Sequence, residues 1–167
     1  SLMFGIINLS GGDPPEIILS SALVVDGLVS PHGSVPGQDE TFNRDKIMQD
    51  LLHDGAPPTL ARVADLSGLG FQLVGARVVK GERIGVVVVY EKDGLRYACQ
   101  MFSGFVSGSR PDQVRSVHGV TLRGFDRGDS GGVVAWTTGG MTCLFSGPAP
   151  LDELLVAVVA RLTPTTG

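Results

Sequence analysis

A run of strand-like segments joined by very short loops is the feature that most constrains the fold of this 167-residue chain. β-branched and other apolar residues dominate 71–79 and 83–91, which are separated by "KGE". The Asp-Gly pair of "EKDG" then leads into a third such segment, 95–102. Loops this short are typical of β-hairpins, whereas a parallel crossover needs about a dozen residues or more. The three segments therefore predict an antiparallel meander.

Two further segments, 131–138 and 141–147, have a similar composition and are joined by two adjacent glycines. The segment 117–124 is a candidate for one more short strand. The polar, glycine-bearing stretch 103–116 is expected to form a loop. Together these segments predict an antiparallel sheet of about five strands.

Two helices are expected ahead of the sheet. The first occupies 13–28, where Asp13 suits the capping position and Pro14 suits the first turn. The second lies within 40–55 and ends where a glycine and two prolines follow. The apolar stripe of this second helix consists of Ile47, Met48, Leu51 and Leu52.

The end of the chain carries the most regular helical pattern. Within 148–162, leucine and valine recur at intervals of three and four residues, which places them on one face of a helix. That face must pack against an apolar surface, and the preceding sheet is the nearest one. The residues concerned are Leu151, Leu154, Leu155, Val158, Val159 and Leu162.

The fold class that follows is a single α+β domain over 1–167. Its antiparallel sheet of about five strands has two N-terminal helices and a C-terminal amphipathic helix packed on it. Residues 1–12 are expected to be a flexible or membrane-proximal start, and 163–167 a disordered tail. The 24 glycines and 10 prolines fit a chain with many turns.

Charge and hydropathy exclude some classes of partner. The formal net charge is −4 and the isoelectric point about 5.2, without a cluster of lysine or arginine. Binding of nucleic acid depends on a basic surface, so no direct nucleic-acid partner is expected. No apolar run approaches the roughly 18 residues of a membrane span, and the opening residues lack the pattern of a signal peptide.

The string "GDSGG" at 128–132 is the one that surrounds the nucleophile in trypsin-like serine proteases. A serine nucleophile needs a histidine as its base. His32 lies in a proline-glycine loop, His53 closes a helix, and His118 is only a dozen residues before Ser130. Aspartate, glycine and serine also favour turns, so the string is interpreted as a turn between two strands. A serine hydrolase using Ser130 is kept as an alternative function.

The second half of the chain carries a more specific resemblance. It combines a "DLSGLGFQLVGAR" opening, an apolar strand ending in tyrosine, a "VVAW" strand before two glycines, and a leucine-rich helix. Over about residues 40–162 this pattern resembles the extracytoplasmic domain of bacterial transmembrane anti-sigma factors. The matching residues are Asp65, Leu66, Ser67, Gly70, Phe71, Leu73, Val74, Gly75, Arg77, Tyr90, Val133, Val134, Trp136, Gly139, Gly140, Leu154 and Leu155.

The resemblance implies a non-enzymatic sensing or protein-interaction domain of a transcriptional regulator. It implies a regulatory protein partner, a periplasmic or extracytoplasmic location and a membrane tether outside this chain. A homo-oligomer is kept as a further form of partnership. The family's cytoplasmic segment often carries a histidine–cysteine zinc motif, and nothing in this chain matches that motif or the membrane helix. Sigma-factor binding is therefore assigned to none of these residues.

The two cysteines are candidates for a special role. Alternation places Cys99 beside Met101, and Cys143 beside Phe145, on strand faces rich in large apolar groups. Two buried, inert thiols are the favoured interpretation. A disulfide or redox-sensing pair is the alternative, and it requires the two Cα atoms to lie within about 7 Å of each other.

The other notable residues have structural explanations. Trp136 alternates with small and apolar residues and is expected in the core, while Asp152 and Glu153 suit the positive end of the last helix. The histidines lack a spacing suited to a metal, so neither a metal site nor a cofactor is expected. A small-ligand domain using space between helices and sheet is a further alternative function.

Overall fold

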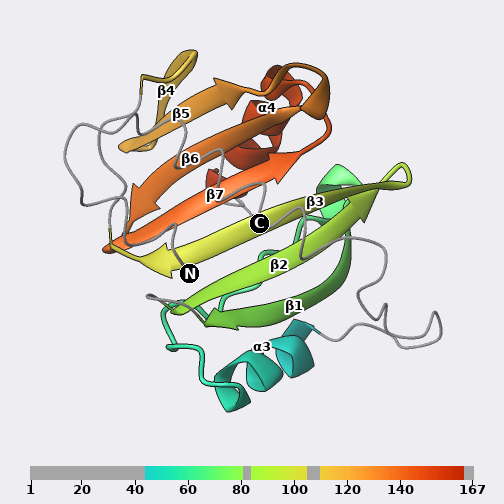
Figure 1. Cartoon of the computed structure of the whole chain (residues 1–167), viewed down its shortest axis with the longest axis vertical. Coiled ribbons are helices and arrows are strands. Elements are labelled where there is room, and N and C mark those ends of the chain that lie inside the picture. The colour runs from blue at the N-terminus through green and yellow to red at the C-terminus, as the bar shows by residue number, and fades with distance from the viewer. Residues whose placement is uncertain (1–43, 81–83, 105–109, 164–167) are drawn as a thin grey trace.

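The computed structural model describes residues 44–80, 84–104 and 110–163, and these ranges form one antiparallel sheet with helices (Figure 1). The sheet has seven strands in the order β1-β2-β3-β7-β6-β5-β4. The strands are β1 Gln72–Lys80, β2 Ile84–Lys92, β3 Leu95–Ser103, β4 Gln113–Val117, β5 Val120–Asp126, β6 Gly132–Thr138 and β7 Met141–Gly147. The helices are α3 Arg44–His53 and α4 Leu151–Leu162, with short 3-10 turns η1 Ser67–Leu69 and η2 Gly128–Ser130.

The predicted meander is confirmed. β1, β2 and β3 pair antiparallel in sequence order, with Tyr90 opposite both Leu73 and Tyr97. The β2–β3 turn is formed by Asp93 and Gly94 with φ values of 53° and 75°. Positive φ at both central residues is the requirement of the tight hairpin turn for which Asp-Gly is preferred.

The second half of the chain extends the same sheet from the other side of β3. β7 pairs antiparallel with β3, with Cys99 opposite Phe145 and Met101 opposite Cys143. β6, β5 and β4 follow outward by successive antiparallel pairing. The last strand of the chain therefore lies at the middle of the sheet, and α4 follows it directly.

The expectation of about five strands is wrong, because the outer hairpin of β4 and β5 was not predicted. β4 lies at the sheet edge with four of its five residues exposed, so it lacks the alternating apolar pattern of a half-buried strand. Its residues fall mainly within the stretch 103–116 that was expected to be a loop. His118 and Gly119, with φ values of 49° and 78°, form a tight turn inside the stretch 117–124 that was expected to be one strand.

The expectation of two N-terminal helices is also corrected, since the described residues hold one short helix before the sheet. The second predicted helix is present as α3, which packs beside β1. Leu51 is buried and Leu52 is 45% exposed, so the apolar stripe is narrower than predicted. The first predicted helix at 13–28, the N-terminal segment 1–12, His32 and residues 164–167 of the predicted tail lie outside the described residues.

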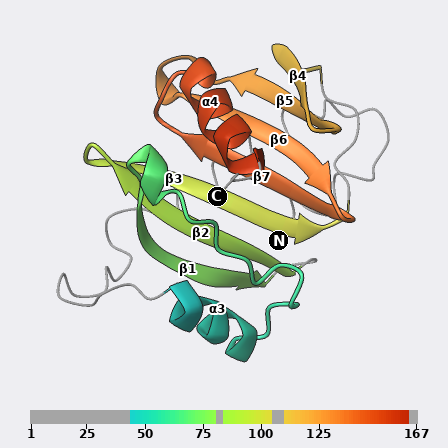
Figure 2. The same cartoon turned by 180° about the vertical axis from the view of Figure 1, so that it is seen from behind.

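One face of the sheet carries the main core. The segment 54–71 crosses β1, β2 and β3, and α4 covers β5, β6 and β7 on the same face (Figure 2). The prediction that the last helix packs on the sheet is thus confirmed, with Leu151, Leu154, Leu155 and Val158 buried. α4 approaches the sheet closely at Gly124, where a Cβ would lie 3.0 Å from the Leu151 side chain.

The opposite face is also largely apolar along the central strands. Val87 and Ala98 are buried there, with Val79 and Val89 packed against them. Gln100 is only 3% exposed, and its register partners Val87 and Leu144 are apolar. Among the described residues, its Oε1 is a buried side-chain oxygen that accepts no hydrogen bond.

Candidate binding groove

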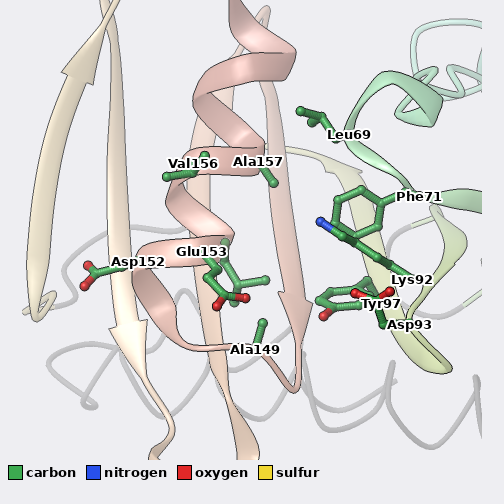
Figure 3. Close-up of a pocket in the computed structure, with 11 residues that line it drawn as sticks. Leu69, Phe71, Lys92, Asp93, Tyr97, Ala149, Asp152, Glu153, Val156 and Ala157 are labelled. Carbon is green, nitrogen blue, oxygen red and sulfur yellow. The ribbon is translucent and has the colours of Figure 1, made fainter.

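A groove of about 460 Å³ lies between the first turns of α4 and the segment that enters β1 (Figure 3). It exists because two separate elements cover the core face of the sheet and do not meet over the start of β3. Buried apolar residues line its floor, and Leu69 and Val156 lie at its sides. The floor residues are Phe71, Tyr97, Ala149, Leu154 and Ala157.

Three aromatic rings give the floor its shape. The Phe71 ring meets the Tyr97 ring edge to face, with centroids 5.0 Å apart and planes at 89°. The Tyr97 ring stacks on that of Phe145 at 6.1 Å with an interplanar angle of 12°. Edge-to-face and stacked arrangements are the favourable geometries for aromatic pairs. The groove therefore has an aromatic floor.

Gly147 allows the Tyr97 ring to reach this position. A Cβ on Gly147 would overlap the Tyr97 ring, with its Cε1 at 2.7 Å. Tyr97 and Gly147 lie on the neighbouring strands β3 and β7. A side chain on the glycine would displace the ring, so this glycine is needed for close approach rather than for an unusual backbone conformation.

Charged side chains surround the rim of the groove. The Lys92 Nζ lies 5.0 Å from the centroid of the Phe71 ring, in a cation–π contact. Asp93 and Glu153 also line the groove, and Figure 3 shows Asp93 beside Tyr97 and Glu153 on α4 across the groove from it. Burial, followed by the charges of Glu153 and Asp93, raises the pKa of Tyr97. Both carboxylates therefore act on the Tyr97 hydroxyl.

Asp152 belongs to the same helical turn as Glu153 and also lines the groove, but its carboxylate has a partner on a strand of the sheet. Its Oδ1 accepts a hydrogen bond of 3.0 Å from the Nε2 of Gln113 in β4. In Figure 3 its carboxylate projects to the side of α4 away from the aromatic rings. The sequence-based explanation, that acids are favourable near the start of a helix, applies to both Asp152 and Glu153. The sequence gave no indication that Glu153 lies beside a groove.

The GDSGG string forms the connection between β5 and β6. Gly128 has a φ of 62°, and its N–H donates a 2.8 Å hydrogen bond to Asp126 Oδ1. Gly131 has a φ of 96°, and a Cβ there would overlap the carbonyl oxygen of Gly147 and lie 2.7 Å from Pro148 Cα. Ser130 is exposed at the end of η2. Backbone conformation and close packing therefore account for the glycines of the string.

The described histidines lie far from Ser130. His118 precedes β5 and Ser130 follows it, and a seven-residue strand rising about 3.3 Å per residue separates the two by roughly 20 Å. His53 is in α3 beside β1, four strand positions from β6, which at about 4.8 Å per strand is roughly 19 Å. Neither histidine is placed to accept a proton from the Ser130 hydroxyl.

The two cysteines lie on neighbouring strands and on the same face of the sheet. Cys99 and Cys143 are 2% and 1% exposed, and both are free thiols. Their register is diagonal, because Cys143 is opposite Met101 and not Cys99. Diagonal Cα atoms are typically about 7–8 Å apart, whereas a disulfide requires less than about 7 Å. The register therefore favours separate thiols.

Arg161 is the polar partner of this sulfur-containing core. Its Nη1 lies 3.3 Å from Cys99 Sγ, and its guanidinium lies 5.6 Å from the centroid of the Trp136 ring. Trp136 is 2% exposed, so its predicted place in the core is confirmed. These contacts fasten the last turn of α4 to β3 and β6. The sequence pattern gave no indication of them, because Arg161 falls outside the apolar stripe.

Two further expectations concern metals and membranes. Within the described ranges, no group of three histidine, cysteine, aspartate or glutamate side chains is placed to hold a metal ion. The helices of those same ranges include none long and apolar enough to cross a membrane.

Arg77, one of the residues that match the anti-sigma pattern, is exposed on β1.

Comparison with known proteins gives no relative for this chain. No protein-family model, no curated protein and no solved structure matches it. Its function must therefore be argued from its own residues.

Proposed function

We propose that this chain is a non-enzymatic binding domain, and that the groove between α4 and the segment entering β1 is its binding site. The observation that carries the proposal is a 460 Å³ groove with an aromatic floor, apolar sides and charged groups at its rim. Binding sites typically combine an apolar concave surface with a few polar groups that orient the ligand. The open sides suit side chains of a peptide segment.

The biological role we propose is sensing or protein interaction in an anti-sigma-type regulator on the extracytoplasmic side of a membrane. The resemblance in sequence supports this role. Several of the residues that match the anti-sigma pattern stabilise the segment beside the groove. Asp65 Oδ1 accepts hydrogen bonds from Ser67 Oγ at 2.6 Å and from Ser67 N at 3.0 Å, which shapes the turn before the groove. The Tyr90 hydroxyl donates to Ala64 O at 2.8 Å and fastens the same segment to β2.

The serine hydrolase alternative is disfavoured by the distances around Ser130. A fluorophosphonate probe tests it directly, because such probes label activated serines. We expect no labelling of the wild-type chain. Labelling that disappears in Ser130→Ala would contradict a non-enzymatic function.

Binding in the groove is tested by nuclear magnetic resonance with the neutral peptide Ac-Leu-Val-Leu-NH2. We expect millimolar peptide to shift the amide signals of Phe71, Tyr97 and Ala157, with smaller changes in the outer hairpin. Val156→Glu places a charge at the exposed side of the groove and should weaken these shifts. Val114→Glu is the matched control, since Val114 is 62% exposed on β4 and Val156 is 61% exposed. Absence of shifts in the groove would refute the site.

The regulatory role requires a test in cells. The Val156→Glu and Val114→Glu substitutions are introduced into the chromosomal gene, and transcription from sigma-factor-dependent promoters is measured. We expect Val156→Glu to change this transcription and Val114→Glu to leave it near the wild-type level. Equal transcription in all three strains would contradict the anti-sigma role while leaving the groove itself open to other ligands.

A small-ligand domain is the second candidate function, because 460 Å³ also falls in the range of small-molecule sites, about 300–1,000 Å³. Screening a library of neutral, drug-sized molecules against the same amide signals separates the two. Compounds that bind at least tenfold more tightly than the peptide would favour the small-ligand function.

A further inference from the structure

Negatively charged side chains outnumber positively charged ones at the groove rim. Asp93 and Glu153 contribute two carboxylates near the Tyr97 hydroxyl, and Lys92 contributes one ammonium group. That ammonium is held over the face of Phe71 at 5.0 Å, with its Cε 3.5 Å from the position of a Cβ on Gly70. The lysine therefore already has a partner, whereas the charges of both carboxylates act on Tyr97, Asp93 from beside it and Glu153 from α4.

The carboxylates are carried by elements that hold their backbones in place. Asp93 is in the tight turn between β2 and β3, where its φ is 53°. Glu153 is in the first turn of α4, where its N–H donates a 3.0 Å hydrogen bond to Pro150 O. A carboxylate on a fixed backbone loses less conformational freedom when a ligand binds.

We propose that the groove recognises a lysine or arginine side chain flanked by apolar residues, in an extended segment of a protein partner. This inference rests on the proposed function, because it names the class of ligand for the same groove. The apolar side chains would contact Tyr97, Val156 and Leu69, and the cationic group would lie between Asp93 and Glu153. An acidic segment would meet two like charges and one ammonium group that is already engaged.

The electrostatics of Tyr97 agree with this assignment. Its pKa is raised by burial and then by the charges of Glu153 and Asp93, which indicates a negative potential at its hydroxyl. A bound cation would reduce that potential. The aromatic ring also offers a favourable surface to a cationic or guanidinium group.

The experiment compares three peptides that differ in one residue: Ac-Leu-Arg-Leu-NH2, Ac-Leu-Val-Leu-NH2 and Ac-Leu-Glu-Leu-NH2. Dissociation constants are obtained from amide shifts of the whole chain at low salt. We expect the arginine peptide to bind more tightly than the glutamate peptide by roughly tenfold, since each exposed charge pair contributes a factor of about two to five.

Charge-removing substitutions test which carboxylate acts. Glu153→Gln should weaken the arginine peptide by roughly two- to fivefold and leave the valine peptide unchanged. Asp129→Asn is the control, because Asp129 is an exposed acid in η2 that does not line the groove, so its loss should leave binding of both peptides unchanged. Asp93→Asn should act like Glu153→Gln, and asparagine tolerates the positive φ of this turn.

Lys92→Gln should change the affinity for the arginine peptide in the opposite direction. Removing the ammonium should strengthen binding of the arginine peptide by roughly two- to fivefold. If the groove instead preferred an acidic ligand, the glutamate peptide would bind more tightly than the arginine peptide. Lys92→Gln would then weaken binding of the glutamate peptide.

The outcomes separate this inference from the proposed function. If the valine peptide binds in the groove and the arginine and glutamate peptides bind equally well, the cationic ligand class is refuted and the binding site stands. Tighter binding of the glutamate peptide also refutes it. If none of the three peptides shifts the groove residues, both the ligand class and the site are refuted.

Discussion

The carbonyl oxygen of Gly147 occupies the space that a side chain on Gly131 would need. This contact joins the β5–β6 connection to the end of β7, immediately before α4. Gly131 also has a φ of 96°, a conformation that other residues adopt at a cost. The glycine at position 131 of the GDSGG string is therefore needed for packing against β7. Substitution of Gly131 and of Ser130 should have different effects on stability.

Gly131→Ala should lower the free energy of unfolding by about 2–4 kcal/mol, because the new methyl group both strains the backbone and displaces β7. Ser130→Ala should change it by less than about 0.5 kcal/mol, as expected for an exposed turn residue. Urea unfolding followed by circular dichroism measures both. A large effect of Ser130→Ala, or a stable Gly131→Ala chain, would contradict this assignment of roles.

A similar relationship links Gly147 to the groove, since a Cβ on Gly147 would overlap the Tyr97 ring. Gly147→Ala should destabilise the chain by about 2 kcal/mol and weaken the tyrosine signal in near-ultraviolet circular dichroism. The cost should be smaller in a Tyr97→Ala background, because the ring that causes the clash is then absent. Additive costs in this double-mutant cycle would show that the two residues do not interact.

The elements with a strong apolar period were predictable from the sequence. The meander, the β6–β7 hairpin and α4 follow from alternation, Asp-Gly or Gly-Gly turns, and leucine spacing. β4 was missed because an exposed edge strand needs no apolar face. The turn at His118 was missed because residues other than glycine are uncommon at positive φ.

The groove could not be predicted in the same way. Phe71, Lys92 and Tyr97 come from the first half of the sheet, and Glu153 from the last helix. They meet because β7 pairs with β3 and leads directly into α4, which is a consequence of strand order. Local patterns contain no information on that order. The one relevant signal in the sequence was Tyr97, a large aromatic residue three positions after the Asp-Gly turn.

Gln100 provides a stabilising prediction. Its Oε1 is buried and accepts no hydrogen bond from the described residues, and the register partners of Gln100 are the apolar Val87 and Leu144. Gln100→Met keeps the volume of the side chain and removes the unpaired oxygen. We expect the free energy of unfolding to rise by about 1–2 kcal/mol, the cost of burying an unpaired polar group. Thermal unfolding of the two chains at equal concentration measures the change, and a lower melting temperature for Gln100→Met would show that the amide has a favourable role.

The buried acids on the core face predict a loss of stability at alkaline pH. Burial, followed by the nearby Cys99 sulfur, raises the pKa of the Cys143 thiol from 9.0 to about 12. Burial, followed by the same sulfur, also raises the pKa of Tyr90. In the unfolded chain both groups lose their protons at lower pH than in the folded chain. Their contribution to stability is therefore complete below pH 9 and decreases as the pH rises above that value.

Between about pH 9 and 12, Cys143 alone should lower the free energy of unfolding by roughly 1 kcal/mol for each pH unit. Tyr90 should add a similar slope once the pH exceeds its ordinary value of 10.0. Urea unfolding at pH 7, 9, 10 and 11, with a reductant present, measures the slope. Cys143→Ala should remove the part of the slope that begins near pH 9, and Tyr90→Phe should remove the part that begins near pH 10. Each substitution also lowers the free energy of unfolding at pH 7. If both variants keep the slope of the wild-type chain, the alkaline loss of stability must come from other groups.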